Sequence, residues 1–218
     1  MTFEEIKHNE TVRMLIEKAD ATLGTLGYTE HSFAHVGSVA DRCGYILTTL
    51  GYPAELVEKA RIAAWLHDIG NLINRVDHSQ SGALMAFRLL DKMGMPMEDI
   101  ADIAAAIGNH DEGNGMPVSP MAAALILADK SDVRRSRVRN DDKSTFDIHD
   151  RVNYSVTKTE LKINEAHTLI KLKLTVDTHY SSAMDYFQIF MERMQLCQKA
   201  AESLGLHFQL MFNEQKMM

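Results

Sequence analysis

The adjacent residues His67 and Asp68 are the pair in this sequence best suited to chemistry. They end an apolar helical run that begins near Leu56, and Gly70 follows them as a helix stop. A neutral imidazole beside a carboxylate suits one divalent metal ion, or two ions bridged by the carboxylate. The same dipeptide also occurs at ordinary helix ends, where the histidine is satisfied and the aspartate is solvated. The pair therefore needs support from other residues.

That support comes from further candidate ligands, which also lie at helix ends. Apolar periodicity predicts helices over residues 3–23, 32–50, 54–69, 78–92, 97–107 and from 119 onward. His35 lies in the first turn of the second helix, His78 starts the fourth, and His110 follows the fifth. Asp129 directly follows the almost wholly apolar part of the sixth helix, where a carboxylate is costly unless it is paired or binds a metal. Because helix ends of a bundle can meet at one patch, these residues predict a metal site, although Asp129 also fits a simple exit to solvent.

The composition describes an ordinary globular protein. The chain has 218 residues, 45% of them hydrophobic, so it can form one domain or one domain with a small appendage. A formal net charge of −7 excludes a chain-wide basic field for nucleic acid, and ten histidines hint at a metal. The two cysteines, Cys43 and Cys197, form no C-x-x-C pair, which favours reduced, buried thiols. The chain begins without a signal core and has no apolar run of about 18 residues, so we expect a soluble cytoplasmic protein with no membrane partner.

The pattern of the chain changes near residue 140. Residues 140–144 read as a linker or exposed loop, and a period of two then predicts strands over 152–163, 170–176 and 207–212. The first strand slips phase once, which predicts a bulge, and a helix is expected over 181–204. We therefore predict a helical metal-binding domain over 1–140 and a small α+β domain over 145–218, a β-β-α-β unit with a three-stranded antiparallel sheet. An edge strand of this sheet offers a route to a homodimer.

The ordered set of His35, His67-Asp68 and Asp129 resembles the signature of HD-domain metal-dependent phosphohydrolases. The resemblance covers roughly residues 30–135 and includes the typical words His67-Asp68-Ile69-Gly70 and Ala128-Asp129-Lys130. It implies a mainly α fold, an HD-type helical bundle that cleaves phosphate esters and anhydrides, with these four residues holding one metal. His78 and His110 match the extra histidines of dinuclear members, in which Asp68 would bridge to a second ion; otherwise they are polar groups behind the ligands. The donor types suit Fe, Mn, Co, Ni or Zn without choosing among them.

His31 competes with His35 for the place of the first ligand, because spacing alone does not separate them. The resemblance favours His35, which precedes the small-apolar helix. His8, His31, His149, His167, His179 and His207 are interpreted as structural.

Two branches of the family serve as comparisons. Cyclic-dinucleotide phosphodiesterases carry a His-His-Glu loop ending in Gly-Tyr-Pro, whereas this chain has Asn109-His110-Asp111 and Gly115-Met116-Pro117. Asn71 also replaces the usual lysine after Gly70. These departures disfavour cyclic-dinucleotide cleavage. Hydrolases of nucleotides or dinucleoside polyphosphates are nearer in size, but they lack the β-β-α-β tail predicted here.

A run of basic residues follows Asp129. If the helix continues, Lys130, Arg134 and Arg137 share one face and would clamp the phosphate of a substrate. The alternative is a solvated basic face that pairs with Asp132, Asp141 and Asp142. Arg75 is a weaker candidate for the same role.

These residues predict metal-assisted hydrolysis of a small phosphorylated substrate, most simply a nucleotide. His67 and Asp68 are the predicted catalytic residues, with Asp68 both binding the metal and orienting the attacking water. Asp111 and Glu112 are possible acids or bases, and equally ordinary loop residues. The alternative function is a non-catalytic metal or nucleotide sensor that docks a partner through the C-terminal unit. The complete ligand set favours the hydrolase.

Overall fold

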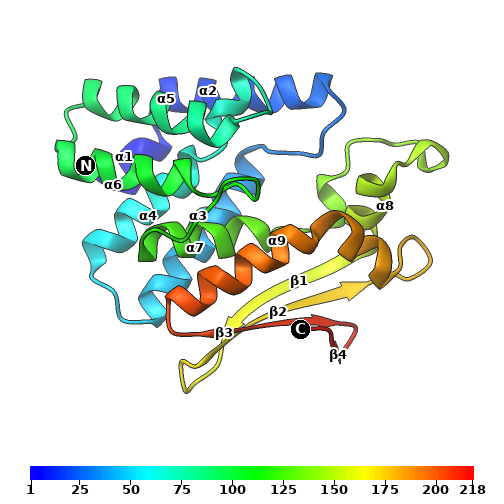
Figure 1. Cartoon of the computed structure of the whole chain (residues 1–218). Coiled ribbons are helices and arrows are strands. Elements are labelled where there is room, and N and C mark those ends of the chain that lie inside the picture. Colours follow the sequence, from blue (N-terminus) through cyan, green and yellow to red (C-terminus); the bar gives the residue numbers. More distant parts are fainter.

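A computed structural model describes all residues 1–218 of the protein. The first 130 residues contain helices but no strands, joined by turns and by a longer loop between α6 and α7 (Figure 1). The α-helices of this part are α1 (Phe3–Lys7), α2 (Glu10–Thr25), α3 (Phe33–Thr49), α4 (Ala54–Leu66), α5 (His78–Lys92), α6 (Met97–Gly108) and α7 (Pro120–Lys130). A short 3-10 helix, η1 (Ile69–Leu72), lies between α4 and α5. The predicted mainly α fold is confirmed.

Helix α7 is the centre of the bundle, as its apolar sequence predicts. Residues 121–128 are all buried, and the helix contacts α3, α4, α6 and the later helix α9 (Ala183–Ser203). Ser119 starts α7 by accepting a hydrogen bond from the amide of Ala122, and Pro120 fits the first turn because its missing amide needs no partner. Asp129 is therefore carried to the end of a fully buried helix.

The turn after α4 packs unusually close to α5. A Cβ atom at Gly70 would collide with the carbonyl oxygen of His78 and the amide nitrogen of Gly82. Only glycine allows this approach. Gly70 thus positions the start of α5, and with it His78, directly beside His67 and Asp68.

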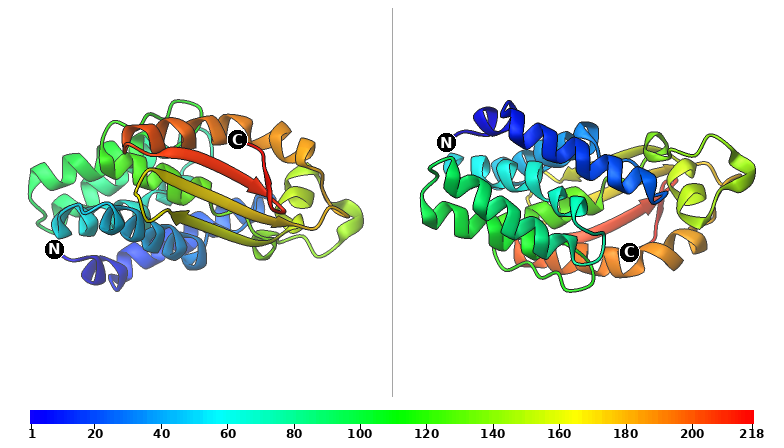
Figure 2. Two further views of the ribbon diagram at one scale, coloured as in Figure 1. Left: turned by 90° about the horizontal axis from the view of Figure 1, so that it is seen from below. Right: turned by 90° about the horizontal axis from the view of Figure 1, so that it is seen from above.

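The C-terminal part forms a four-stranded sheet with the order β1-β2-β3-β4. The strands are β1 (Val156–Ile163), β2 (Leu169–Val176), β3 (His207–Phe212) and β4 (Gln215–Lys216). Helix α9 lies along one face of this sheet, between it and the helical bundle (Figure 1). Seen from below, the sheet lies in front of the helices (Figure 2). Its alternate residues Ile170, Leu172 and Leu174 point into the core.

Two predictions about this sheet are wrong. It has four strands rather than three, because a tight turn at Asn213 and Glu214, both with positive φ, adds the short strand β4. It is also not fully antiparallel, since β3 pairs with β2 in parallel. The reason is α9, which returns the chain to the end of the sheet where β2 began, and such a crossover produces a parallel neighbour.

The start of the predicted first strand is also different. Residues 148–155 form helix α8 (Ile148–Ser155), which Asp147 caps by accepting a hydrogen bond from the amide of Asp150. The predicted slip in phase is confirmed as a register shift between Val156 and Lys158. Asn164 starts the turn between β1 and β2, where its side-chain oxygen accepts hydrogen bonds from the amides of Thr168 and Leu169.

The apolar core is continuous across the two parts of the chain. Buried residues of α3, α7, α9 and β2 belong to one cluster, and both cysteines are buried and unpaired. The division into domains near residues 140–145 stays a prediction, as does dimerisation through an edge strand, of which β1 and β4 are the two. None of the helices combines the length and apolar character that crossing a bilayer requires.

Candidate metal centre

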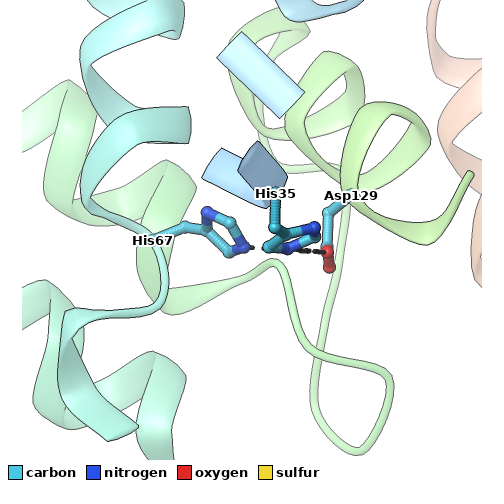
Figure 3. A group of neighbouring side chains, drawn as sticks. All are labelled: His35, His67 and Asp129. Atoms are coloured by element: carbon cyan, nitrogen blue, oxygen red, sulfur yellow. Dashed lines mark ion pairs between the residues drawn. The ribbon is translucent and has the colours of Figure 1, made fainter. Parts of the chain in front are cut away.

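The helix ends converge as the sequence predicts. His35 comes from the first turn of α3, His67 and Asp68 follow α4, and Asp129 lies at the end of α7. Nε2 of His35 is 3.3 Å from Oδ1 of Asp129, and Nε2 of His67 is 3.6 Å from the same oxygen. Figure 3 shows the two rings and the Asp129 carboxylate pointing toward one another from three helices. Oδ2 of Asp68 is 3.4 Å from Nε2 of His35, so four of the predicted ligands face one point.

The histidine rings are held by their outer nitrogens. Nδ1 of His35 lies 2.8 Å from Oδ2 of Asp132, and Nδ1 of His67 lies 2.7 Å from the carbonyl oxygen of Ala64. Because these partners only accept hydrogen bonds, each Nδ1 carries a proton, and each Nε2 faces the centre, where it can offer a lone pair to a metal. This arrangement of outer acceptors is typical of metal-ligating histidines.

A second group lies on the other side of Asp68. Nδ1 of His78 contacts the carbonyl oxygen of Arg75 at 3.1 Å, and Nδ1 of His110 contacts that of Ile107 at 2.6 Å. Their Nε2 atoms lie 3.2 Å apart. Oδ1 of Asp68 is 3.6 Å from Nε2 of His78, whereas Oδ2 is 3.1 Å from Nε2 of His67. The two oxygens of Asp68 therefore face the two groups separately.

Three buried polar atoms at the centre have no hydrogen-bond partner. They are Nε2 of His35, Nε2 of His67 and Oδ2 of Asp68. Burying such atoms unpaired costs roughly 1–3 kcal/mol each. Ligand atoms of His35, His67 and Asp129 lie close enough together for one ion, as do those of His67, Asp68 and His110. The residues present therefore fit a divalent metal.

The electrostatics of the cluster favour a cation. Burial acts to lower the pKa of His67, but Asp68 and Asp129 outweigh it and raise the pKa to about 10. Burial acts to raise the pKa of Asp129, but Lys130 and the two histidines hold it well below its usual range. Both carboxylates are therefore ionised at neutral pH, and without a metal a proton on His67 supplies the positive charge between them.

Comparison with known families agrees with this geometry. Residues 32–134, just under half of the chain, match the model of the HD domain family. The chain contains an HD domain. This match confirms the resemblance that the order of His35, His67-Asp68 and Asp129 indicated.

Two individual proteins are also similar. An uncharacterized protein of Methanocaldococcus jannaschii is 25% identical over 185 residues, which cover 74% of this chain and 71% of that protein. The solved structure of a predicted HD superfamily hydrolase from an uncultured Thermotogales bacterium is 26% identical, with a TM-score of 0.46 over 58% of this chain and 69% of that one.

A cavity of about 530 Å³ opens onto the candidate metal ligands Asp68, His78 and Asp129. His31 lines this cavity, and its ring lies edge-on to that of His35 at a centroid distance of 5.3 Å. Burial and the nearby charge of Arg137 hold the pKa of His31 well below its usual value. The structure thus brings His35 into the cluster and leaves His31 beside it, on the cavity wall.

The basic residues after Asp129 do not share a helical face, so that prediction is wrong. Helix α7 ends at Lys130. Asp132 therefore lies outside the helix, and its buried carboxylate accepts a hydrogen bond from Nδ1 of His35. Arg134 pairs with Glu30 and Asp132 and does not line the cavity. Lys130 and Arg137 do line it, but both are buried. The alternative pairing with Asp132 is found for Arg134 and Arg137, at 3.2 and 3.9 Å.

Several residues of the site were missed by the sequence interpretation. Asp132 was considered only as a surface partner, although it holds His35 from behind. His149 of α8 and Arg193 of α9 line the cavity from outside the HD domain. No local pattern marks these two residues, because the folding of the C-terminal part onto the bundle brings them to the site.

Proposed function

We propose that this HD domain is a metal-dependent phosphohydrolase that cleaves a phosphate ester or anhydride of a small substrate, most simply a nucleotide. The observation that carries the proposal is the convergence of six candidate ligand side chains, three of which line a cavity, with buried ligand atoms left without hydrogen-bond partners. A non-catalytic sensor would be served by a closed site. Here the ligands Asp68, His78 and Asp129 are open to the cavity, which favours catalysis.

His35, His67, Asp68 and Asp129 would hold one ion, and Asp68, His78 and His110 a second, with Asp68 bridging. When bound, such an ion (Fe, Mn, Co, Ni or Zn) supplies Lewis acidity and lowers the pKa of water toward about 7. Oδ2 of Asp68, which has no hydrogen-bond partner, would orient the attacking water. The water oxygen forms the new bond to phosphorus, the bond from phosphorus to the leaving oxygen breaks, and that oxygen ends protonated.

Asp111 is the carboxylate we assign to proton transfer at the leaving oxygen. It lines the cavity, and its Oδ2 is 3.9 Å from Nδ1 of His78. Glu112 is unsuited, because Lys130 and Arg193 outweigh the effect of its burial and hold its pKa far below the usual value. The proton that the attacking water loses would pass through the Asp111 carboxylate to the leaving oxygen.

The test combines metal analysis of the purified protein with a phosphate-release screen over nucleotides and dinucleoside polyphosphates. We expect about two ions per chain after reconstitution with Mn²⁺ or Fe²⁺, and turnover that Asp68→Ala abolishes. Metal bound without turnover of any phosphate would instead support the sensor. Failure to bind metal after reconstitution would disprove the metal centre itself.

A further inference from the structure

Four cationic side chains line the cavity, and three of them are already neutralised. Nζ of Lys130 is 2.7 Å from Asp129 and 2.6 Å from Glu112. Nε of Arg193 is 2.9 Å from Glu112. Arg137 donates to the carbonyl oxygens of Glu30 and Asp132 at 2.8 Å and is buried. These three residues stabilise the folded site and have few donors left for a substrate.

Arg75 is the fourth, and no carboxylate lies within ion-pair distance of it. Its Nη1 is 3.2 Å from Oδ1 of Asn71 and 3.3 Å from Nε2 of His78. Arg75 therefore contacts the edge of the candidate metal cluster directly. The ring of Tyr28 lies 5.8 Å from the guanidinium carbon and supports it from the side. Both contacts are made by Nη1, so the N–H donors of Nε and Nη2 remain free and form a planar fork at the cavity.

The outer wall of the cavity is acidic. Helix α8 contributes Asp147 and Asp150, and neither forms an ion pair with a basic residue. In total, six carboxylates and four cationic side chains line the cavity. Positive charge for an anionic substrate is therefore concentrated at the metal cluster and Arg75, and the α8 wall repels further anionic groups.

We infer that the cavity takes a single terminal phosphoryl group, bound by the fork of Arg75 beside the metal cluster, and that the acidic α8 wall selects phosphate monoesters with a neutral leaving group over polyphosphate chains. The inference rests on the proposed function, since it names the substrate class of that site. The first phosphoryl group meets the metals and Arg75. A second or third would extend toward Asp147 and Asp150, where no unpaired cation offsets its charge.

Calorimetric titration of inorganic phosphate into Mn²⁺-loaded protein tests the role of Arg75 without requiring turnover. Arg75→Gln should weaken phosphate binding by about tenfold to a hundredfold, because hydrogen bonds to a charged group are lost. Arg75→Lys should fall between, since it keeps the charge but loses the fork. Arg88→Gln is the matched control, because Arg88 is exposed on α5 and does not line the cavity.

Each Arg75 variant is compared with the wild type for metal content and melting temperature. Unchanged phosphate affinity in a folded, metal-loaded Arg75→Gln protein would overturn the inference. Phosphate binding that depends on Arg75 in a protein without turnover would support the binding role and count against the proposed hydrolysis, so the two failures are distinct.

The α8 wall is tested by competition between adenosine monophosphate and adenosine triphosphate, with free Mn²⁺ held constant and in excess. Wild-type protein should prefer the monophosphate by at least about tenfold, since like-charge contacts are costly. The double variant Asp147→Asn, Asp150→Asn should narrow that preference while keeping the α8 cap, because Asn caps a helix as well as Asp does. Tighter binding of the triphosphate by wild-type protein, or an unchanged preference in the double variant, would overturn this part of the inference.

Discussion

The two walls of the cavity differ in how their side chains are held. On the inner wall, built by the HD domain, each histidine ligand is fixed through Nδ1 by a carboxylate or a carbonyl oxygen. On the outer wall, Asp147 and His149 of α8 are exposed to solvent. The histidines of the inner wall are therefore held in place for a metal, whereas the exposed side chains of the outer wall can change position when a substrate binds. The proposed chemistry and the proposed selectivity are therefore assigned to different segments of the chain.

The largest expected effect concerns protons on the inner wall. In the metal-free protein His67 is protonated up to its pKa of about 10, so a metal must displace one proton to bind. Metal affinity should rise about tenfold per pH unit, or about a hundredfold between pH 6.5 and 8.5. Mn²⁺ titrations over this range, in buffers of different ionisation enthalpy, measure both the affinity and the proton release. An affinity independent of pH would show that His67 is neutral before the metal arrives.

The same protonation affects the stability of the metal-free protein. The pKa of His67 is raised above its ordinary value of 6.5, so its contribution to the free energy of unfolding is complete below pH 6.5. That contribution should be lost as the pH rises through about 10. Denaturant unfolding of the metal-free protein across this range is the corresponding measurement.

The next effect concerns the support of the inner wall. Asp132→Asn should weaken metal binding by about 10- to 100-fold, the usual cost of changing the residue behind a ligating histidine. The amide can turn its NH2 group toward Nδ1 of His35 and favour the wrong tautomer. Competition with a chelator measures the affinity, and Asp141→Asn, an exposed change on the loop before α8, is the control. Equal affinities for both variants would show that the tautomer of His35 does not depend on Asp132.

A smaller effect is expected where the inner wall is packed. Gly70→Ala places a methyl group against the backbone of His78 and Gly82 and should lower the free energy of unfolding by about 1–3 kcal/mol. Gly113→Ala, where no atom lies within 4 Å of the added Cβ, should change it by less than about 0.5 kcal/mol. Urea unfolding of the two variants distinguishes the sites, and similar losses would contradict the close approach of η1 and α5.

The smallest effect is expected on the outer wall. His149→Ala should leave metal affinity unchanged and shift KM only severalfold, about the value of one polar contact. His179→Ala, an exposed histidine that does not line the cavity, should change neither quantity. Loss of metal from the His149→Ala protein would show that the outer wall also supports the metal site.

The inner wall was predictable from sequence because its residues are local signals. His67-Asp68 ends a helix, and His35, His78, His110 and Asp129 each sit at a boundary that periodicity and capping residues reveal. His31 and His35 were not separable in this way, since both lie near the start of the same helix. The contact that distinguishes them is between Nδ1 of His35 and Asp132, ninety-seven residues away.

The errors have the same origin. The helix was expected to continue from Lys130 to Arg137, but the burial of Asp132 against His35 draws the chain out of it. Periodicity of two does not encode strand direction, so the parallel pairing of β2 and β3 was missed. Asp147 is a residue typical of a helix start, whereas the alternation of Val152, Tyr154 and Val156 predicts a strand. In the structure Asp147 caps α8, and residues 148–155 are helical. The outer wall depends on such long-range packing throughout.

The ion pair between Glu112 and Arg193 has a consequence for the order of assembly during synthesis. It joins the loop that carries His110 to α9, across eighty-one residues of sequence. Since a chain emerges from the ribosome N-terminus first, all six ligands become available before the helix that closes the cavity. We therefore expect that the site can bind a metal before α9 closes the cavity.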